Sequence, residues 1–262
     1  MKVIFHEDFY QVYTSDPAAA AGRMEAIVAV IEPEVEFVKA VPAKEAQIAL
    51  AHPQAHIDSV RKSGLYDIAA LAAGAAIQAA EIGLATPGFA LIRPPGHHAS
   101  SSSCWGFCYF NNMAIALQTL HKNGQLSSAY VLDIDLHYGD GTVNILQEED
   151  YVCVHNVEGR DRRSYLAEIE NELDHVQADI IGVSAGFDLH QDDWGGLLAT
   201  EDYFTIGELV KKASLRCGCG CFGILEGGYN HQVLGQNVLS FIQGLKGYNL
   251  ITSRRENYDD SI

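Results

Sequence analysis

The chain has 262 residues, of which 48% are hydrophobic, and a formal net charge of -17. A chain of this length forms one large α/β domain or two small ones, and its hydrophobic fraction is enough for a substantial core. The acidic balance argues against nucleic acid as a direct partner, because phosphate binding needs a basic face. It favours cationic molecules at long range instead.

The start of the chain lacks the basic segment and long apolar run of a signal peptide. The most apolar stretch, residues 68–85, carries Gln78 and Glu81 among many alanines, which is typical of a packed helix and not of a membrane span. We therefore expect a cytoplasmic protein that has no membrane partner. The sequence leaves its oligomeric state open, and its six cysteines are expected to stay reduced.

In the first part of the chain the predicted elements alternate between strands and helices. Strands are expected at residues 2–5, 35–41, 48–51 and 89–92, and helices from Asp16-Pro17 towards Val30 and over residues 68–84. His52 and His56 lie four residues apart where Pro53 begins a further helix. No third ligand is near them in the sequence, so we interpret both as structural histidines.

The second part continues the alternation. Helices are expected at residues 112–120, 142–147, 165–176, 204–212 and 232–245, and strands at residues 129–134, 152–154, 180–184 and 222–225. No break resembling a linker interrupts this order. It predicts an α/β fold with one domain over residues 1–252, a mostly parallel sheet with helices on both faces, and a polar tail over residues 253–262.

The densest group of charged and metal-binding side chains follows the predicted strand at 129–134. It reads Asp133-Ile134-Asp135-Leu136-His137-Tyr138-Gly139-Asp140. Side chains alternate along an extended chain, so Asp133, Asp135 and His137 share one face at the end of the strand. Carboxylates and an imidazole that project together can bind one divalent metal. The alternative is a solvated loop, but buried charge is costly unless it is paired or bound to metal.

Four other polar segments fall at or near the ends of predicted strands. They are Arg93-Pro94-Pro95-Gly96-His97-His98-Ala99, Gly106-Phe107-Cys108-Tyr109-Phe110-Asn111-Asn112, Ser184-Ala185-Gly186-Phe187-Asp188 and Leu225-Glu226-Gly227-Gly228-Tyr229. Ligands of open parallel sheets bind at the carboxyl ends of the strands. The strand order therefore predicts one site at this edge of the sheet.

With these segments in this order over residues 89–230, the chain resembles the metal-dependent histone deacetylase and acetylpolyamine amidohydrolase family. The resemblance implies the arginase–deacetylase fold. It also implies an enzyme, a zinc-dependent deacylase that hydrolyses an N-acyl amide with metal-activated water. The acyl group would be carried by a lysine side chain, a polyamine or another small amine.

The resemblance also implies roles for individual residues. The metal ligands would be Asp135, His137 and Asp188, a set that suits Zn²⁺, with Fe²⁺ as the alternative. Two adjacent histidines suit proton transfer, with His98 as general base and then acid and His97 as electrostatic stabiliser. The partners of these histidines would be Asp133 for His97 and Asp140 for His98. The Tyr229 hydroxyl would donate to the oxyanion.

Other residues receive weaker assignments. The resemblance places Gly106 and Phe107 in the substrate tunnel and Arg23 beside an internal pocket, for which a surface arginine is the alternative. The loop at 156–164 is short, so we expect an open tunnel mouth, and Trp194 either covers the rim or packs elsewhere. A K⁺ ion is implied at the carbonyls of Asp135, His137 and Val154 with Asp133, although Cys153 replaces the serine of relatives. Arg160, Arg162 and Arg163 are expected to be solvated or paired with Asp161 and Glu158.

Two other functions compete with the deacylase. A ureohydrolase of arginase type shares the fold but needs a two-metal cluster, and His97-His98 and the segment 226–229 argue against it. A non-catalytic acyl-binding module would lack Tyr229 or a metal ligand, and this chain has them all. The run Cys217-Gly218-Cys219-Gly220-Cys221 is open to two interpretations. It binds a soft metal from one strand face, or, as we favour, it allows a close approach to the next buried strand.

Overall fold

A parallel sheet forms the centre of the protein in the computed structural model, which describes residues 1–247. Its seven strands lie in the order β2-β1-β3-β7-β6-β4-β5, and every neighbouring pair is parallel. The strands are β1 Lys2–Phe5, β2 Glu36–Lys39, β3 Gly88–Ala90, β4 Ala129–Asp133, β5 Val152–Asn156, β6 Ile180–Ala185 and β7 Gly220–Leu225. The predicted α/β fold with a single parallel sheet is confirmed.

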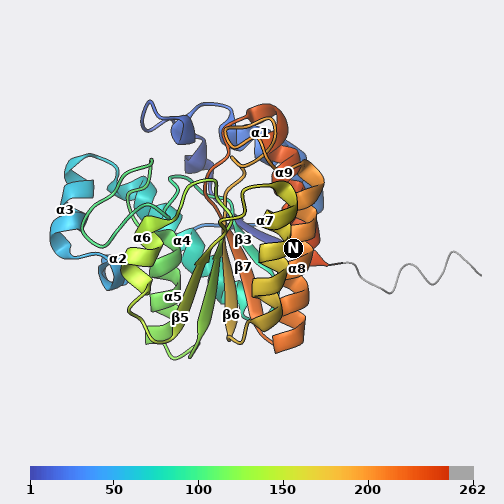
Figure 1. Ribbon diagram of the computed structural model, residues 1–262. Coiled ribbons are helices and arrows are strands. Elements are labelled where there is room, and N and C mark those ends of the chain that lie inside the picture. The colour runs from blue at the N-terminus through green and yellow to red at the C-terminus, as the bar shows by residue number, and fades with distance from the viewer. Residues whose placement is uncertain (248–262) are drawn as a thin grey trace, which may run out of the picture.

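Helices cover both faces of this sheet. They are α1 Arg23–Ile31, α2 Glu45–Ala51, α3 Gln54–Lys62, α4 Tyr66–Gly83, α5 Asn112–Lys122, α6 Asp140–Leu146, α7 Arg162–His175, α8 Thr200–Cys217 and α9 His231–Lys246. Figure 1 shows α4 and α5 on one side of the strands and α7, α8 and α9 on the other. None of the helices in the described part of the chain is long and apolar enough to cross a membrane.

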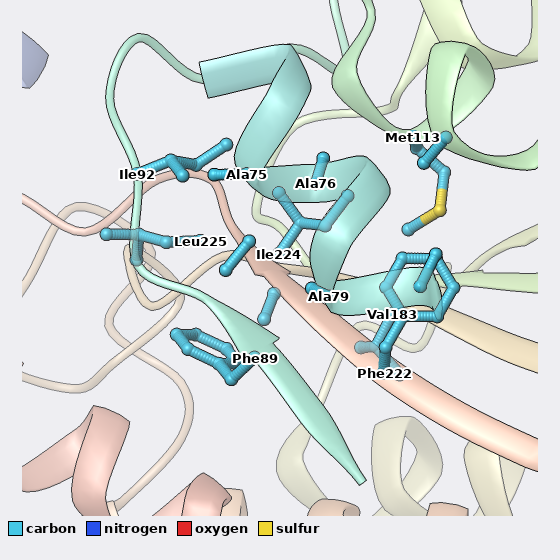
Figure 2. Close-up of a cluster of buried hydrophobic side chains, with 14 of the residues drawn as sticks. Ala75, Ala76, Ala79, Phe89, Ile92, Met113, Val183, Phe222, Ile224 and Leu225 are labelled. Atoms are coloured by element: carbon cyan, nitrogen blue, oxygen red, sulfur yellow. The ribbon is translucent and has the colours of Figure 1, made fainter. Parts of the chain in front are cut away.

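The core lies where the central strands meet α4. Every residue of β3, β4, β6 and β7 is buried, as strands covered on both faces require. Ala75, Ala76 and Ala79 face the sheet, and their short side chains allow α4 to pack closely on β3 and β7 (Figure 2). On the other face, the ring of Phe89 lies 6.0 Å from that of Phe241 in α9.

Two predicted elements differ from the structure. Residues 48–51 belong to α2 and not to a strand. Ile48 and Ala51 are buried three positions apart, which suits one helix face, and the Gln47 side chain accepts a hydrogen bond from the Lys44 backbone at the start of the helix. The helix expected from Asp16-Pro17 is interrupted: a 3₁₀ turn covers Pro17–Ala19, Ala20 is extended, and α1 begins at Arg23.

The cysteine run forms the connection from α8 to β7. Cys217 ends α8 and is joined to Cys219 by a disulfide, so the expectation that all cysteines stay reduced is wrong for this pair. The run does not present three cysteines on one strand face, which removes the metal interpretation. A Cβ at Gly220 would lie 2.3 Å from the carbonyl oxygen of Gly83, so a small residue is needed where the run enters β7, and the close contact there is with the end of α4. The tail expected at residues 253–262 lies outside the described residues.

The central core generates the first prediction. Phe222 in β7 is fully buried and its ring points towards Met113 of α5 (Figure 2). Phe222→Ala should lower the free energy of unfolding by about 3–5 kcal/mol, because the vacated volume leaves a cavity. The matched control is Leu215→Ala, since Leu215 is 68% exposed, and it should change the value by less than about 0.5 kcal/mol. Urea unfolding measures both. Equal losses in the free energy of unfolding in the two variants would contradict the assignment of Phe222 to the core.

Candidate active site

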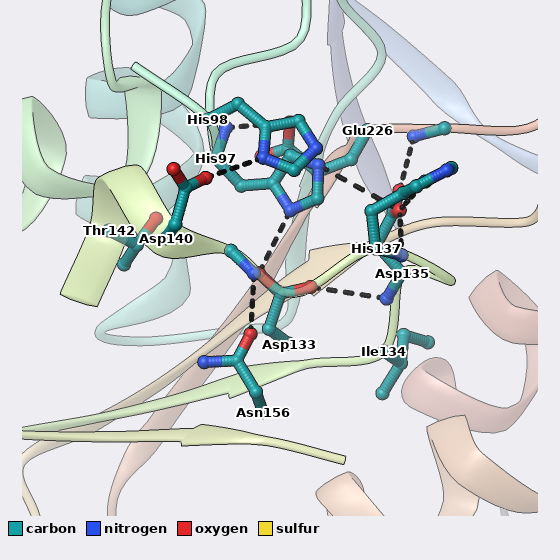
Figure 3. Close-up of polar contacts among 12 residues, drawn as sticks. His97, His98, Asp133, Ile134, Asp135, His137, Asp140, Thr142, Asn156 and Glu226 are labelled. Carbon is teal, nitrogen blue, oxygen red and sulfur yellow. Dashed lines mark hydrogen bonds and ion pairs between the residues drawn. The ribbon is translucent and has the colours of Figure 1, made fainter. Parts of the chain in front are cut away.

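The polar segments converge at the carboxyl ends of four adjacent strands, β3, β7, β6 and β4. His97 and His98 follow β3, Asp188 follows β6, Glu226 to Tyr229 follow β7, and the segment 133–140 follows β4. Each strand is buried and parallel to the next, so their ends share one edge. The structure therefore brings together residues that are up to 132 positions apart in the sequence, from His97 to Tyr229. Figure 3 shows His97 and His98 beside the segment 133–140 and Glu226.

Three side chains could hold one metal ion. The ligating atoms of Asp135, His137 and Asp188 all lie within 4.8 Å of one another. Nδ1 of His137 is 3.2 Å from Oδ1 of Asp135 and 3.1 Å from Oδ2 of Asp188. Two ligands bound tetrahedrally to Zn²⁺ lie about 3.3 Å apart, given metal–ligand bonds of about 2.0 Å. The separations therefore suit ligands that share one ion.

The buried carboxylates show why a cation fits here. Oδ1 of Asp188 accepts a hydrogen bond from the Leu136 backbone, whereas its buried Oδ2 has no partner other than Nδ1 of His137, 3.1 Å away, among the described residues. Burial, and then the negative charge of Asp135, raise the pKa of Asp188 to about 6. Hydrogen bonds to Asp135 and Asp188 raise the pKa of His137 to about 10. A group that attracts a proton this strongly also attracts a metal ion.

The backbone around the carboxylates leaves no spare room. Gly227 donates its N–H to Oδ2 of Asp135 over 2.9 Å. A Cβ at Gly227 would lie 2.6 Å from that oxygen and 2.7 Å from Oδ2 of Asp188, so glycine is needed for this approach. The donated hydrogen bond and the one from the His137 backbone fix the orientation of Asp135.

Each of the two histidines is paired with a different carboxylate. Nδ1 of His97 lies 3.1 Å from Oδ2 of Asp133, and Nδ1 of His98 lies 2.7 Å from Oδ1 of Asp140. Figure 3 shows the two imidazoles side by side, each joined to its aspartate. An aspartate that accepts from Nδ1–H leaves Nε2 of the same ring free as a base. The pairs are those that the family resemblance implied.

The environments of the two histidines differ. Nε2 of His97 lies 3.8 Å from Oδ1 of Asp135, so this ring sits between two aspartates. Burial opposes its charge, but Asp135 and Asp133 outweigh burial and raise the pKa of His97. For His98, burial and then the neighbouring His97 lower the pKa to about 4. His97 is therefore suited to the charged form and His98 to the neutral form.

A buried arginine and a buried glutamate lie on the inner side of the site. Oε2 of Glu226 accepts hydrogen bonds from the backbones of Gly96 and His97, and burial raises the pKa of this acid to about 7. Arg23 is fully buried and donates to the backbone oxygens of Glu226 and Gly228. The alternative of a surface arginine is therefore wrong. Arg23 instead supports the backbone that carries the next residue, Tyr229.

Tyr229 is enclosed by aromatic rings. Trp194 stacks on it with ring centroids 4.1 Å apart, and Phe107 meets it edge-on at 6.0 Å. Oδ2 of Asp193 accepts hydrogen bonds from the backbones of Tyr229 and Asn230, which ties the two loops together. Trp194 is 53% exposed and also lies edge-on to His137, so it covers part of the rim and is not a distant packing residue.

Trp105 is a residue that our sequence interpretation missed. Its indole N–H donates to Oδ2 of Asp140 over 2.9 Å, and its ring lies 3.9 Å from that of His98. The signal available in the sequence was its position directly before Gly106 and Phe107. A tryptophan at that position is close enough along the chain for its side chain to pack against His98.

The short loop after β5 is directed away from the site. The backbone N–H of Glu158 donates to Glu168 in α7, and Asp161 caps the start of the same helix. Arg162 pairs with Asp202 and Glu201 in α8 at 2.7 and 3.1 Å. Arg162 is therefore paired, but its partners are in α8 and are not the expected Asp161 and Glu158.

His52 and His56 are structural, as predicted. His52 accepts a hydrogen bond from the Asn111 backbone and contacts the carbonyl oxygen of Ser101, while His56 contacts that of Tyr109. Their rings stack at 4.8 Å. They fasten α3 to the segments that lead into and out of the site.

Comparison with known proteins gives the family. The model of the histone deacetylase domain matches residues 18–165. A probable deacetylase of Methanothermobacter thermautotrophicus is 30% identical over 94% of this chain and 91% of that protein. The chain belongs to the histone deacetylase family. It is accordingly a hydrolase of the histone deacetylase type, and the predicted family and enzyme class are confirmed.

One further relative supports this membership, and a solved structure supports the fold. The polyamine deacetylase HDAC10 of Danio rerio is 30% identical over 88% of this chain, which spans 40% of that protein. The crystal structure of the HDA15 HD domain matches with a TM-score of 0.83 over 94% of this chain and 89% of that chain. At 23% identity, the second likeness shows the histone deacetylase fold alone.

The carboxylate cluster generates a prediction about metal binding. Zn²⁺ at a hundred times its Kd should raise the free energy of unfolding of the wild type by about 2.7 kcal/mol. Asp188→Asn should abolish this increase at the same concentration, because the buried carboxylate loses its charge. Without metal, the variant should be at least as stable as the wild type, since one of two like buried charges is gone.

The measurements are urea unfolding with and without Zn²⁺ and metal content per chain. The control is Asp192→Asn, whose carboxylate is 60% exposed and which should keep the full Zn²⁺ effect. Wild-type metal content in Asp188→Asn would show that Asp188 is not a ligand.

Proposed function

We propose that this protein is a zinc-dependent deacylase that hydrolyses the N-acyl amide of a cationic amine. The proposal depends on one observation, which is that the candidate groups lie at the same edge of the sheet. Asp135, His137 and Asp188 converge there with a free imidazole nitrogen and a tyrosine hydroxyl within one aromatic enclosure. This combination offers metal binding, proton transfer and oxyanion stabilisation together.

Asp135, His137 and Asp188 would hold the ion, with Fe²⁺ as the alternative to Zn²⁺. When bound there, the ion lowers the pKa of a water molecule and polarises the acyl oxygen, which is the chemistry it supplies. The potassium site at Asp133 and the cytoplasmic location stay predictions.

His98 moves the proton. Its Nδ1 is held by Asp140, so Nε2 receives the proton of the attacking water and later delivers it to the departing amine nitrogen. His97 lies deeper, between Asp133 and Asp135, and its positive charge opposes the negative charge that develops during attack. The difference in environment supports this division of roles.

Tyr229 stabilises the oxyanion. Arg23, held by the carbonyls of Glu226 and Gly228, lies 5.5 Å from its ring, and Asp193 anchors its backbone. Burial raises the pKa of the tyrosine, so its hydroxyl stays protonated and can donate a hydrogen bond. A donor that is fixed before the reaction costs no reorganisation when charge develops.

The rim favours an acylated cation. Phe107 opposite Tyr229 provides apolar walls for an alkyl chain, and the exposed rings of Trp105 and Trp194 offer faces that attract cations. The net charge of -17 acts in the same direction. Acetylpolyamines and acetyl-lysine both fit this description. The name of the zebrafish relative, a polyamine deacetylase, supports the first.

The ureohydrolase alternative loses support. Among residues 1–247, a single group of three ligating side chains lies close enough to hold metal, whereas a two-metal cluster needs further ligands. A non-catalytic binding module is likewise disfavoured, because Tyr229 and all three ligands are placed at the edge where the histidines lie.

The proposal is tested by hydrolysis of paired substrates. The rate constant kcat/KM for an acetylated diamine should exceed that for an anionic N-acetyl amino acid and should fall as salt is raised, because salt screens the attraction. A chelator should abolish both activities and Zn²⁺ should restore them. The proposed specificity is wrong if the anionic substrate is preferred and loses that preference in Arg160→Ala or Arg163→Ala. Full activity after removal of metal would contradict the metal-dependent mechanism.

The role of Tyr229 gives a second prediction. Tyr229→Phe removes only the hydroxyl and should lower kcat by about 10²–10³ while KM changes little. The control is Tyr66→Phe on α4, outside the site, which should retain wild-type kcat. Steady-state kinetics on the acetylated diamine measures both variants. Unchanged kcat in Tyr229→Phe would make Tyr229 a packing residue.

A further inference from the structure

The two histidine–aspartate pairs are covered differently. The side chains of His97 and Asp133 are 4% and 1% exposed, so the fold itself buries this pair. The side chain of His98 is also 4% exposed, yet its partner Asp140 is 44% exposed. His98 therefore lies at the boundary with solvent and needs a cover that the sheet and helices do not supply.

Trp105 is that cover. Its ring centroid lies 3.9 Å from that of His98 with the planes tilted by 33°, while the His97 ring lies 4.0 Å away at 41°. Two rings this close to the same centroid occupy opposite faces of it. His98 is thus held between His97 and Trp105. Trp105 is itself 56% exposed, so its outer side meets the water that it keeps from His98.

The same indole fixes the partner of His98. Oδ1 of Asp140 accepts from Nδ1 of His98 at 2.7 Å, and Oδ2 accepts from Nε1–H of Trp105 at 2.9 Å. With a separate donor on each oxygen, rotation of the carboxylate would break at least one hydrogen bond. Trp105 therefore restrains a solvent-facing carboxylate that water would otherwise compete for.

The backbone beside Trp105 explains how the ring arrives there. Gly106 and Phe107 have φ values of 57° and 68°, so the chain turns sharply directly after the tryptophan. A Cβ at Gly106 would lie 2.3 Å from Cδ2 of His98, so the backbone itself runs against the imidazole. The turn directs Trp105 to His98 and Phe107 to Tyr229.

We propose that Trp105 is a positioning residue for proton transfer by His98, acting through Asp140 and through the face of the imidazole. The inference rests on the proposed function. When His98 holds the proton taken from water, Asp140 opposes its charge and the π-face of the indole attracts the imidazolium. Trp105 thus makes two separable contributions, one through its N–H and one through its ring.

Two substitutions separate these contributions. Trp105→Phe keeps an aromatic face and removes the N–H, and it should lower kcat roughly 10-fold, the scale of one hydrogen bond to a charged group. Trp105→Leu also removes the aromatic face and should lower kcat about 3- to 10-fold further. KM should change little in Trp105→Phe, which keeps an aromatic face for the cationic substrate and loses only the contact with Asp140. Trp105→Leu also removes that face and should raise KM in addition to lowering kcat.

A double-mutant cycle distinguishes positioning from a general structural effect. In Asp140→Ala the indole N–H has no carboxylate to hold, so Trp105→Phe should then change kcat less than about 2-fold. The matched control is Trp194→Phe, the same chemical change on the tryptophan that stacks on Tyr229. Its effect should be equal in the wild type and in Asp140→Ala. Thermal unfolding and metal content establish that each variant is folded and loaded.

A spectroscopic measurement needs no turnover. In ¹⁵N-labelled protein, the Nδ1–H signal of His98 is identified by its loss in His98→Ala. Its exchange with solvent should be at least about 10-fold faster in Trp105→Leu than in the wild type, and should change less in Trp105→Phe, which keeps a ring over the imidazole.

The outcomes separate this inference from the proposed function. The positioning role is overturned if Trp105→Phe acts on KM alone, or lowers kcat equally in both backgrounds, or if Nδ1–H exchange is unchanged in Trp105→Leu. Wild-type protein that hydrolyses no acyl amide when loaded with metal would refute the proposed function. The exchange measurement would still decide whether Trp105 shields and holds the His98–Asp140 pair.

Discussion

The rest of the site depends on two carboxylates that are buried against each other. Asp135 and Asp188 lie at the ends of adjacent strands, and among residues 1–247 neither forms an ion pair with an arginine or a lysine; their nearest basic neighbour is His137. Two like charges out of water are unfavourable unless a cation binds between them. The backbone next to the two carboxylates is adapted to them at Gly227, which has no side chain to collide with them and donates its N–H to Asp135. A metal ion bound between the two carboxylates would therefore stabilise this edge of the sheet.

The parallel sheet determines which groups reach that edge. Because the middle four strands are neighbours and point the same way, their loops supply the carboxylates, the histidines and the tyrosine from four separate parts of the chain. The inner half, with His97 and Glu226, is fully enclosed, and its polarity is balanced by backbone donors and by Arg23. The outer half, with His98 and Tyr229, is closed by single tryptophan side chains. The inner half of the site is thus supported rigidly by the fold, and the outer half is in contact with solvent.

Features that depend on neighbouring residues could be predicted from the sequence, whereas contacts between distant residues could not. The strands, the parallel sheet and the set Asp135, His137 and Asp188 follow from local patterns and from a family resemblance, because they depend on residues next to one another or in a fixed order. The helix at residues 48–51 was mistaken for a strand because four apolar-rich residues are too few to show a period. The contact of Trp105 with Asp140 joins residues 35 positions apart, and no periodicity encodes it.

The short loop after β5 has a consequence for the charge at the mouth. This loop is tied to α7 by the hydrogen bond from the Glu158 backbone to Glu168 and by the cap that Asp161 forms. The rim is instead formed by Trp105 and Trp194, which exclude water without carrying charge. These two rings carry no charge of their own, and Arg162 at the start of α7 is paired with Asp202 in α8. Under the proposed function, a cationic amine would meet attraction at long range and π-faces at short range, and both would act before its acyl group reached His98 and Tyr229.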